Sequence, residues 1–540
     1  MGKAIFQPIS KRSARRAVMS GRKDVSRRGF IRAAAGGAGV AALGGLAAAP
    51  KAAANGETAW DRECDVVVVG YGGAGATAAI TAHDAGARVV ILEKGGEGGG
   101  STYYSGGFFV SPRDVAGAVD YLMDCARAGD GHHFDIDRDD LTAWAEEAVQ
   151  NEPWFRSLGG DPFVSLRGWY ADAPGADSYV TWQPRENPTG VGLWQVLSRA
   201  VEERGIEVVY NAPGERLVTR EAADDGSPVE VLGIVAAGAD GPVAIRADRA
   251  VVLTCGGFDY NETLKQSYLR SYPHYSTGHP GNTGDAIALA ARAGAALWRL
   301  TGTSANLCHK LPDVPVAFPS QLQLNAMSLS VVLVNRQGRR FVNEALNYDA
   351  VAKSLDNFDA VGRAFQNNPC WCVFDEKTRV KAPAGLPVPI GNPVYQWSAD
   401  NSAEIEKGWI VRADTVAELA GRMEIEPAVL EATISTYNEH CARGSDPDFG
   451  RALGLIPLDE PPYYALKGYP GLWATGGGPR IDRQAQVLDV AGRAVPRLYV
   501  AGSASSFCFS HLYPLSGTAI GDCFAMGRIA GRNASAQEGW

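Results

Sequence analysis

Cysteine is scarce in this chain of 540 residues, and its nine cysteines are scattered without a repeated spacing. No two of them form C-x-x-C, so the sequence predicts no disulfide framework, haem attachment site or iron–sulfur cluster. Cys370-Trp371-Cys372 and Cys308-His309 are better explained by packing than by metal ligation. We therefore expect no metal site.

Long apolar stretches are missing as well, because no run after residue 54 approaches the ~20 residues that span a bilayer. Residues 55–540 carry 40 basic and 59 acidic side chains, a net charge of −19. This acidity argues against a nucleic-acid partner, since phosphate backbones would be repelled. The whole chain is 46% hydrophobic and 21% charged, as in a packed globular protein of two or three domains.

Glycine, in contrast, is abundant: 64 residues, or about 12% of the chain, against a usual ~7%. Glycine permits positive φ angles and close approach of the backbone to a ligand. The surplus therefore predicts glycine-rich loops around a bound molecule.

The first 54 residues have the three parts of an export signal. A twin-arginine motif, S-R-R-G-F-I-R at residues 26–32, precedes an uncharged Ala/Gly-rich run and an A-x-A-like cleavage site at residues 52–54. This pattern is typical of a substrate of the twin-arginine translocase. We expect the mature chain to begin near Asn55 and to work in the periplasm or at the outer face of the cell membrane.

A dinucleotide-binding motif follows directly. Residues 65–69 are an apolar, β-branched run typical of a buried parallel strand, and residues 70–75 read G-Y-G-G-A-G, a match to G-x-G-x-x-G. An Ala-rich segment, residues 74–85, predicts a helix, and residues 88–93 predict a second strand that ends in an acid. Strand, turn, helix and acid are thus in the register of a βαβ nucleotide site.

Each residue of this motif has a physical task. Gly70 makes the tight turn, and Gly72 lets the backbone approach a pyrophosphate at the helix N-terminus. Gly75 allows helix and strand to pack closely, while Glu93 accepts hydrogen bonds from ribose hydroxyls. The motif therefore predicts a bound dinucleotide.

A second glycine-rich loop, residues 95–101, is followed by S-G-G at residues 105–107. Here the chain resembles the FAD-binding flavoproteins of the fumarate reductase/succinate dehydrogenase superfamily, and residues 251–258, 281–285 and 497–521 extend the resemblance. The residues assigned to FAD by this resemblance, with the motif above, are Gly70, Gly72, Gly73, Ala74, Gly75, Glu93, Lys94, Gly100, Ser101, Ser105, Gly106, Gly107, Gly256, Gly257, Asp285, Gly502, Ser503, Ser516, Thr518, Ala519 and Ile520.

The resemblance implies an α/β fold with a Rossmann-like FAD-binding domain in two segments, residues 55–304 and 476–540. An inserted α+β capping domain, residues 305–475, would hold the substrate. Residues 205–250 read as a small β-meander within the FAD-binding domain. No histidine occupies the region around Ser101–Ser105 where succinate dehydrogenases attach flavin, so the resemblance implies non-covalent FAD. At Ser503 many relatives place an acid.

The chain departs from the fumarate reductases of this superfamily at the residues that bind the dicarboxylate. In those fumarate reductases, an R-F-x-N-E motif is followed four residues later by the proton-donating Arg, and Tyr348 occupies that position here. The loop at residues 510–517 also lacks the second Arg that binds the substrate. The segment at residues 474–478 lacks the family's His. A dianion needs cations to offset its desolvation, so these departures argue against fumarate as the substrate.

The same positions are similar to the 3-ketosteroid dehydrogenases, above all the 3-ketosteroid Δ1-dehydrogenases. N-E-x-x-x-Y ends at Tyr348, and Y-P-x-x-G runs from Tyr513 to Gly517. By this resemblance Tyr513 and the Gly517 N–H hold the substrate carbonyl, Tyr348 moves a proton on the adjacent carbon, and Tyr170 assists. Family members have Y-P-G-P-G, whereas this chain has Leu515 and Ser516 before Gly517. This difference leaves the substrate and the position of the double bond open.

Three functional hypotheses follow. The first is an exported FAD enzyme that introduces or reduces a C=C bond next to a ketone in an apolar molecule such as a 3-ketosteroid, exchanging electrons with a quinone or redox protein. The second is an anaerobic respiratory reductase of a non-steroid enone or unsaturated acid. The third is a flavin-carrying subunit with a silent site, which would be indifferent to loss of Tyr348 and Tyr513.

Overall fold

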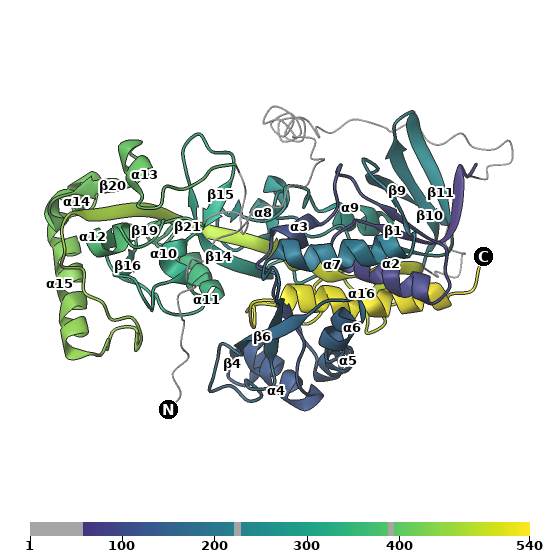
Figure 1. Ribbon diagram of the computed structural model, residues 1–540, viewed down its shortest axis with the longest axis horizontal. Helices are drawn as coiled ribbons and strands as arrows, with labels where there is room; N and C mark the ends of the chain where they lie inside the picture. Colours follow the sequence, from purple (N-terminus) through teal and green to yellow (C-terminus); the bar gives the residue numbers. More distant parts are fainter. Residues whose placement is uncertain (1–57, 221–227, 387–393) are drawn as a thin grey trace, which may run out of the picture. The chain divides into compact units, whose positions relative to one another are not determined.

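The computed structural model describes residues 58–220, 228–386 and 394–540. The twin-arginine motif and the cleavage site predicted for residues 1–54 lie outside these residues. Within them, no helix combines the length and the apolar character needed to cross a membrane. The architecture is built around two large sheets (Figure 1).

The first sheet contains five parallel strands in the order β24-β11-β1-β2-β8, with β23 antiparallel at one edge. β1 and β2 confirm the two strands predicted on either side of the glycine turn, because both are buried β-branched runs. The strands of this group are β1 Arg62–Val69, β2 Val89–Leu92, β8 Glu207–Val209, β11 Gly241–Leu253, β23 Gln486–Leu488 and β24 Ala494–Val500.

Helices cover this sheet. The predicted helix is α2, Gly73–Asp84, and the C-terminal helix α16, Thr518–Ala536, lies alongside it (Figure 1). Small residues permit this contact: a Cβ at Gly527 would lie 2.9 Å from the Thr77 side chain. The neighbouring helices are α3 Gly100–Tyr104, α7 Gly190–Glu203, α8 Glu262–Tyr268 and α9 Asp285–Arg292.

The predicted meander over residues 205–250 is correct only in part. β9 (Gly214–Arg220), β10 (Glu230–Gly238) and the first half of β11 form it by antiparallel pairing. Residues 207–209 instead form β8, which pairs parallel to β2 in the main sheet. The reason is topological, because α7 is a helical crossover and a crossover returns the chain in the parallel direction.

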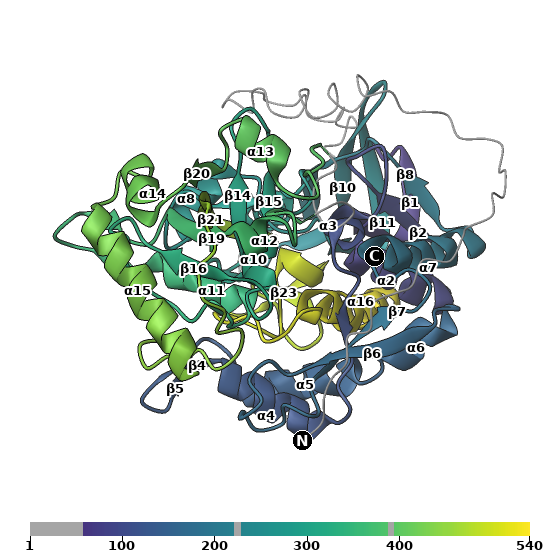
Figure 2. The ribbon, with the colours of Figure 1, turned by 60° about the vertical axis from the view of Figure 1, so that its left-hand side comes forward.

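The second sheet is mainly antiparallel, in the order β15-β14-β21-β19-β16, and helices α14 and α15 pack on one of its faces (Figure 2). Its strands are β12 Tyr275–Ser276, β14 Thr303–Lys310, β15 Ala317–Pro319, β16 Val331–Val334, β19 Cys370–Asp375, β20 Val411–Ala413 and β21 Tyr463–Thr475. Its helices are α10 Gln321–Leu324, α11 Tyr348–Lys353, α12 Glu376–Arg379, α13 Ser402–Glu406, α14 Val416–Arg422 and α15 Pro427–Arg443.

Strands β14 and β21 join the two sheets. They pair antiparallel from Thr303 opposite Thr475 to Cys308 opposite Tyr469, so the chain enters and leaves the second sheet side by side. The hydrophobic core under the first sheet draws its residues from outside residues 299–480, and two further cores lie within residues 307–466. This arrangement is a mixed α/β fold, as the sequence predicted.

A smaller three-stranded sheet, β3-β7-β6, packs with helices α4, α5 and α6 into the core of the first sheet. Its elements are β3 Phe109–Val110, α4 Val115–Cys125, α5 Arg138–Ala148, α6 Asn151–Ser157, β6 Pro162–Arg167 and β7 Val180–Pro184. The loop after β6 carries Trp169 and Tyr170 towards the site described next.

Candidate active site

A cavity of about 740 Å³ extends from the glycine turn after β1 to the strands β14 and β21. At one end it is bounded by the loops that follow β1, β2 and β11. At the other end it is bounded by aromatic side chains and by residues of α10 and α11. We call these the nucleotide end and the substrate end.

The glycine turn at the nucleotide end needs the residues that it has. Gly70 adopts a φ of 106°, which side chains other than glycine rarely allow. A Cβ at Gly75 would lie 1.9 Å from the Gly70 carbonyl oxygen. The space beside Gly72 is open by comparison, the nearest atom to a Cβ there being 3.7 Å away. The turn therefore leaves room for a ligand at the N-terminus of α2, where backbone N–H groups favour an anion.

Glu93 follows directly after β2, and its carboxylate is fixed by the backbone. It accepts hydrogen bonds from Tyr71 N at 2.9 Å and Gly95 N at 2.7 Å. Lys94 binds Asp285 at 2.7 Å and Thr283 at 2.8 Å, which ties the second glycine-rich loop to the start of α9. These contacts place an acid and a lysine in the cavity wall beside the glycine turn.

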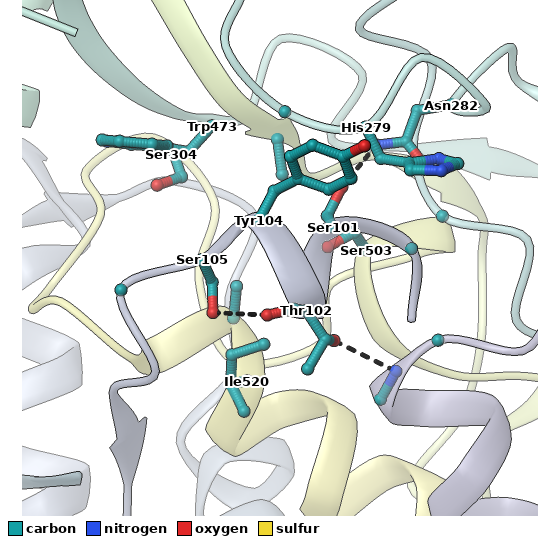
Figure 3. A pocket seen from close by; sticks show the side chains of 18 of the residues that line it. Ser101, Thr102, Tyr104, Ser105, His279, Asn282, Ser304, Trp473, Ser503 and Ile520 are labelled. Atoms are coloured by element: carbon teal, nitrogen blue, oxygen red, sulfur yellow. Dashed lines mark hydrogen bonds between the residues drawn. The ribbon is translucent and has the colours of Figure 1, made fainter. Parts of the chain in front are cut away.

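The second glycine-rich loop packs directly on the first. The Gly73 N–H donates to Thr102 Oγ1 at 3.0 Å, and the Asn282 amide donates to Ser101 Oγ at 2.8 Å. Figure 3 shows the ring of Tyr104 beside His279 above Ser101. His279 Nδ1 accepts from Gly281 N at 3.0 Å and its pKa is lowered to about 4 by burial, so the ring is neutral with its proton on Nε2.

Most of the residues predicted to hold the cofactor line this cavity. They are Gly70, Gly72, Gly73, Ala74, Glu93, Lys94, Gly100, Ser101, Ser105, Gly106, Gly256, Asp285, Ser503, Ser516, Ala519 and Ile520. The remaining predicted residues pack behind the wall instead: Gly75, Gly107, Gly257, Gly502 and Thr518. A Cβ at Gly107 or Gly257 would come within 2.4 Å of neighbouring atoms, so these glycines serve close packing. The glycine cradle, the fixed acid and the helix N-terminus fit a dinucleotide.

Two tyrosines face each other at the substrate end. Tyr348 begins α11 and Tyr513 lies in the loop before α16, and their ring centroids are 6.5 Å apart. Trp169 packs edge-on against Tyr348 at 4.8 Å and lies 6.3 Å from Tyr513. Trp473, from β21, contacts Tyr348 from another side at 6.4 Å. The fold therefore brings together the two predicted tyrosines, which are more than 160 positions apart in the sequence.

The two phenol hydroxyls have different partners. Tyr513 accepts a hydrogen bond from the Ala519 N–H at 2.8 Å, and Tyr348 accepts one from Ser516 Oγ at 3.1 Å. The Ser304 hydroxyl interacts with both phenols. Burial raises the pKa of Tyr348 and of Tyr513 above the ordinary phenol value, so both are protonated at neutral pH.

Gly517 and Tyr170 complete the sequence-predicted set, and His511 lies near Gly517 in the sequence. Gly517 caps α16 with a φ of 94°, and a Cβ there would lie 2.9 Å from Phe108 atoms, so only glycine fits. Tyr170 lines the cavity, but its hydroxyl interacts with Asn347, and burial raises its pKa to about 12. His511 packs its ring on Phe134, with centroids 4.6 Å apart, and its pKa is lowered to about 4.

Sequence reasoning missed Ser304 and Trp473, which reach the site through the pairing of β14 with β21. It also missed an apolar pocket beyond the phenols, formed by Leu324, Met327, Leu346, Leu386 and Leu453. Exposed apolar residues carry little signal in a sequence, because single ones are common on protein surfaces. The exposed fractions of Met327 and Leu453, 55% and 62%, become meaningful only where the two lie at one cavity.

Charge is confined to the nucleotide end. Among the described residues that line the cavity, the charged ones are Glu93, Lys94 and Asp285, and all three belong to that end. The Arg340 and Glu344 side chains of the R-F-V-N-E motif form a buried bidentate pair at 2.8 Å, which Arg451 joins at 3.0 Å. That motif thus belongs to a buried ion-pair network and places no cation next to the phenols.

His440, Asp446 and Asp448 are close enough together to share a cation. Arg340 already binds Asp446 at 2.9 Å, so a positive charge is present at this place without a metal. Asp446 thus belongs to the Arg340 ion-pair network, and the three side chains are not among the residues that line the cavity.

The family model described as "FAD binding domain" matches residues 65–520. The chain belongs to this FAD-binding family. The match extends over both glycine loops, both phenols and the start of α16, which is the cavity described above. The cofactor of this flavoprotein is FAD.

Curated relatives of this flavoprotein act in both redox directions. It is 28% identical to 4-oxocyclohexanecarboxylate 2-dehydrogenase of Sinomonas cyclohexanicum, over 88% of this chain and 93% of that one. It is also 28% identical to 3-oxosteroid 1-dehydrogenase of Mycobacterium tuberculosis (88% and 99%) and to urocanate reductase of Eggerthella lenta (88% and 75%).

Solved structures show the same fold. The 3-ketosteroid Δ1-dehydrogenase of Sterolibacterium denitrificans aligns with a TM-score of 0.77 at 24% identity, over 88% of this chain and all of that one. The 3-ketosteroid Δ4-(5α)-dehydrogenase of Rhodococcus jostii aligns with a TM-score of 0.68 at 26% identity, over 90% and 99%. The flavoprotein is an FAD-dependent oxidoreductase acting on CH–CH or C=C bonds.

Proposed function

We propose that the flavoprotein introduces or reduces a C=C bond next to a ketone in an apolar substrate, in the manner of the 3-ketosteroid dehydrogenases. The observation that carries this proposal is the pair of neutral phenols in an aromatic wall, next to an apolar pocket. No guanidinium or ammonium group of the described residues lines this end of the cavity, and a dicarboxylate would need one.

The residues divide the chemistry as follows. Tyr513 accepts from the Ala519 N–H, so its own proton is available to donate to the ketone oxygen, and Gly517 lies at the start of the same helix. The Tyr513 hydroxyl and the N-terminus of α16 would stabilise negative charge on that oxygen. Tyr348 transfers the proton at the adjacent carbon, with Ser516 and Ser304 next to its hydroxyl. Bound FAD supplies the hydride acceptor or donor.

Several parts of this proposal rest on the sequence. The twin-arginine motif supports export to the periplasm or to the outer face of the cell membrane. There a quinone or a redox protein would exchange electrons with FAD, which would be held non-covalently. The capping domain would be residues 305–475, from β14 to the end of β21. The phenol Tyr170 would assist Tyr348 from its place in the cavity wall.

The test is anaerobic. Photoreduced enzyme is mixed with enone steroids, smaller enones, urocanate and fumarate, and re-oxidation of the flavin is followed by its absorbance. Oxidised enzyme is then mixed with saturated ketosteroids and 4-oxocyclohexanecarboxylate in the presence of a dye. We expect turnover with ketones or enones in at least one direction and none with fumarate. Fumarate as the best acceptor would refute the proposal.

The second candidate is a reductase of a non-steroid enone or unsaturated acid. The raised pKa of Tyr348 favours the reductive direction that this candidate requires, because a protonated phenol is ready to donate its proton at neutral pH. The same panel separates the two candidates, since re-oxidation by urocanate or by small enones in preference to steroids would favour the reductase. A silent flavin subunit would respond to none of them.

A further inference from the structure

Asp349, the residue after Tyr348, joins three segments of the chain at the substrate end. It is fully buried, and its two carboxylate oxygens are used separately. Oδ1 accepts the Ala305 N–H of β14 at 2.9 Å, while Oδ2 accepts the N–H of Tyr513 at 2.9 Å. One side chain therefore binds the backbone of the second phenol from the position next to the first.

Lys353 balances the charge of this carboxylate. It lies one turn further along α11, donates to Asp349 Oδ2 at 2.6 Å and donates to the Thr303 carbonyl at 3.2 Å. Burial raises the pKa of Asp349 and lowers that of Lys353, and the contact between the two offsets both shifts. Arg270 and Asp356 are the next charged groups around Lys353.

The contacts run between the two parts of the chain that the site needs to align. Tyr348, Asp349 and Ala305 lie on elements of the second sheet, and Tyr513 lies in the loop that leads into α16. The phenol hydroxyls contact Ala519 and Ser516 on the α16 side and the Ser304 hydroxyl on β14. The hydrogen bond from the Tyr513 N–H to the Asp349 carboxylate thus holds the main chain of the Tyr513 segment on the side chain next to Tyr348.

We propose that Asp349, held by Lys353, is a positioning residue that sets the separation and alignment of Tyr348 and Tyr513. The inference rests on the proposed function, because it assigns those two phenols to the chemistry. Proton transfer is sensitive to such alignment, and a displacement of about 1 Å at reacting groups costs up to ~10²-fold in rate. Loss of the carboxylate should therefore act on turnover without removing FAD.

The test compares Asp349→Asn with a matched control in the holoenzyme. The amide keeps the size of the carboxylate but can accept only one of the two N–H groups, since its nitrogen is itself a donor. Asp375→Asn is the control, because Asp375 is also fully buried, accepts the N–H groups of Asp459 and Glu460, and pairs with Lys377 at 3.1 Å, away from the cavity.

With a ketone or enone that wild type turns over, Asp349→Asn should lower kcat by about 10²-fold with little change in KM and in FAD content. Asp375→Asn should leave kcat unchanged. Lys353→Met keeps both backbone contacts of Asp349 and should lose less than Asp349→Asn. Equal kcat for Asp349→Asn and wild type, or an equal loss in Asp375→Asn, would overturn the inference.

A crystal structure of the Asp349→Asn holoenzyme gives a readout that needs no substrate. The phenol centroids, 6.5 Å apart here, should separate or tilt relative to wild type. An unchanged phenol pair would refute the positioning role, even if wild type acts on none of the compounds and the proposed function fails on its own. If Asp349→Asn does not yield folded protein, the double variant Asp349→Asn/Lys353→Met is used instead, because it removes both buried charges.

Discussion

The two ends of the cavity are built from different materials. The nucleotide end consists of glycine turns, backbone N–H groups and the fixed carboxylate of Glu93, which come mainly from residues 70–107, the loop after β11 and the turn before α9. The substrate end consists of phenols, indoles and serine hydroxyls that arrive from the loop after β6, from β14, α11 and β21, and from the loop before α16.

This difference explains how members of one FAD-binding family can act on different substrates. A site made by the backbone fails when any side chain is added, so its sequence is constrained position by position. A site made by side chains changes its chemistry by single replacements on an unchanged frame. The dehydrogenases and the reductase described above are each 28% identical to this chain, which fits that view.

The largest effect is expected at the nucleotide end. Gly75→Ala would place a Cβ 1.9 Å from the Gly70 carbonyl oxygen, so α2 cannot keep its approach to β1. We expect the variant to purify without flavin, measured as the ratio of flavin to protein absorbance after release of the cofactor. Gly421→Ala in α14, where a Cβ meets no atom within 4 Å, is the control and should keep its flavin. A yellow Gly75→Ala protein would remove the contrast between the two ends.

Much of the nucleotide end could be predicted from the sequence, because its parts are contiguous and their spacing encodes their task. Gly70, Gly72 and Glu93 stand where a βαβ unit requires them, and the structure places them at one cavity. The sequence also predicted the α/β fold correctly, since β1 and β2 are continuous β-branched runs. The assignment of residues 207–209 to the meander was wrong, because the pairing of β8 depends on a helical crossover that no local pattern reveals.

At the substrate end, Tyr348 and Tyr513 were found only through resemblance to a known family. Ser304 could not be found in this way, because it meets the phenols through the register of β14 on β21, where it pairs with Ala474. Asp349 looks in the sequence like any acid in the first turn of a helix. Its contacts with Ala305 and Tyr513 depend on packing between distant segments.

At the substrate end, removing one hydroxyl group should lower turnover as selectively as the added Cβ of Gly75→Ala prevents FAD binding at the nucleotide end. Tyr513→Phe should lower turnover of the ketone or enone by about 10²-fold, the usual cost of one donor to a developing oxyanion. FAD should stay bound, because the phenol contacts the Ala519 N–H and not the glycine turns. The measurement is kcat together with the flavin content.

Tyr437→Phe is the control for this variant. Tyr437 is also fully buried, but it lies in the core of α15, away from the cavity. Turnover within a factor of about 2 of wild type is expected for the control. Near-normal turnover of Tyr513→Phe would remove its role as oxyanion donor and leave the cavity as a cofactor site alone.

The phenols also predict a difference between the two reaction directions. Oxidation needs a deprotonated phenol as base, and burial raises the pKa of Tyr348 above its ordinary value. Below that pKa the ionised fraction of the phenol rises about tenfold per pH unit, so flavin reduction by a saturated ketone should accelerate about 10²-fold from about pH 7 to 9. Enone reduction uses the protonated phenol and should stay flat. Stopped-flow rates in both directions test this, and a flat oxidation rate would exclude a buried phenol as base.

The smallest expected effect concerns the aromatic wall. Trp169 packs edge-on against Tyr348 at 4.8 Å, and such a contact is worth about 0.5–1.5 kcal/mol beyond the area that it buries. Trp169→Phe keeps an aromatic ring but shortens it, so kcat should fall by about 2–10-fold with FAD retained. Trp154→Phe removes a similar edge-on contact, with Phe524 at 5.1 Å, from the core beside α16, and should leave kcat unchanged. Equal losses in both variants would mean that Trp169 supports the fold and not the orientation of the phenol.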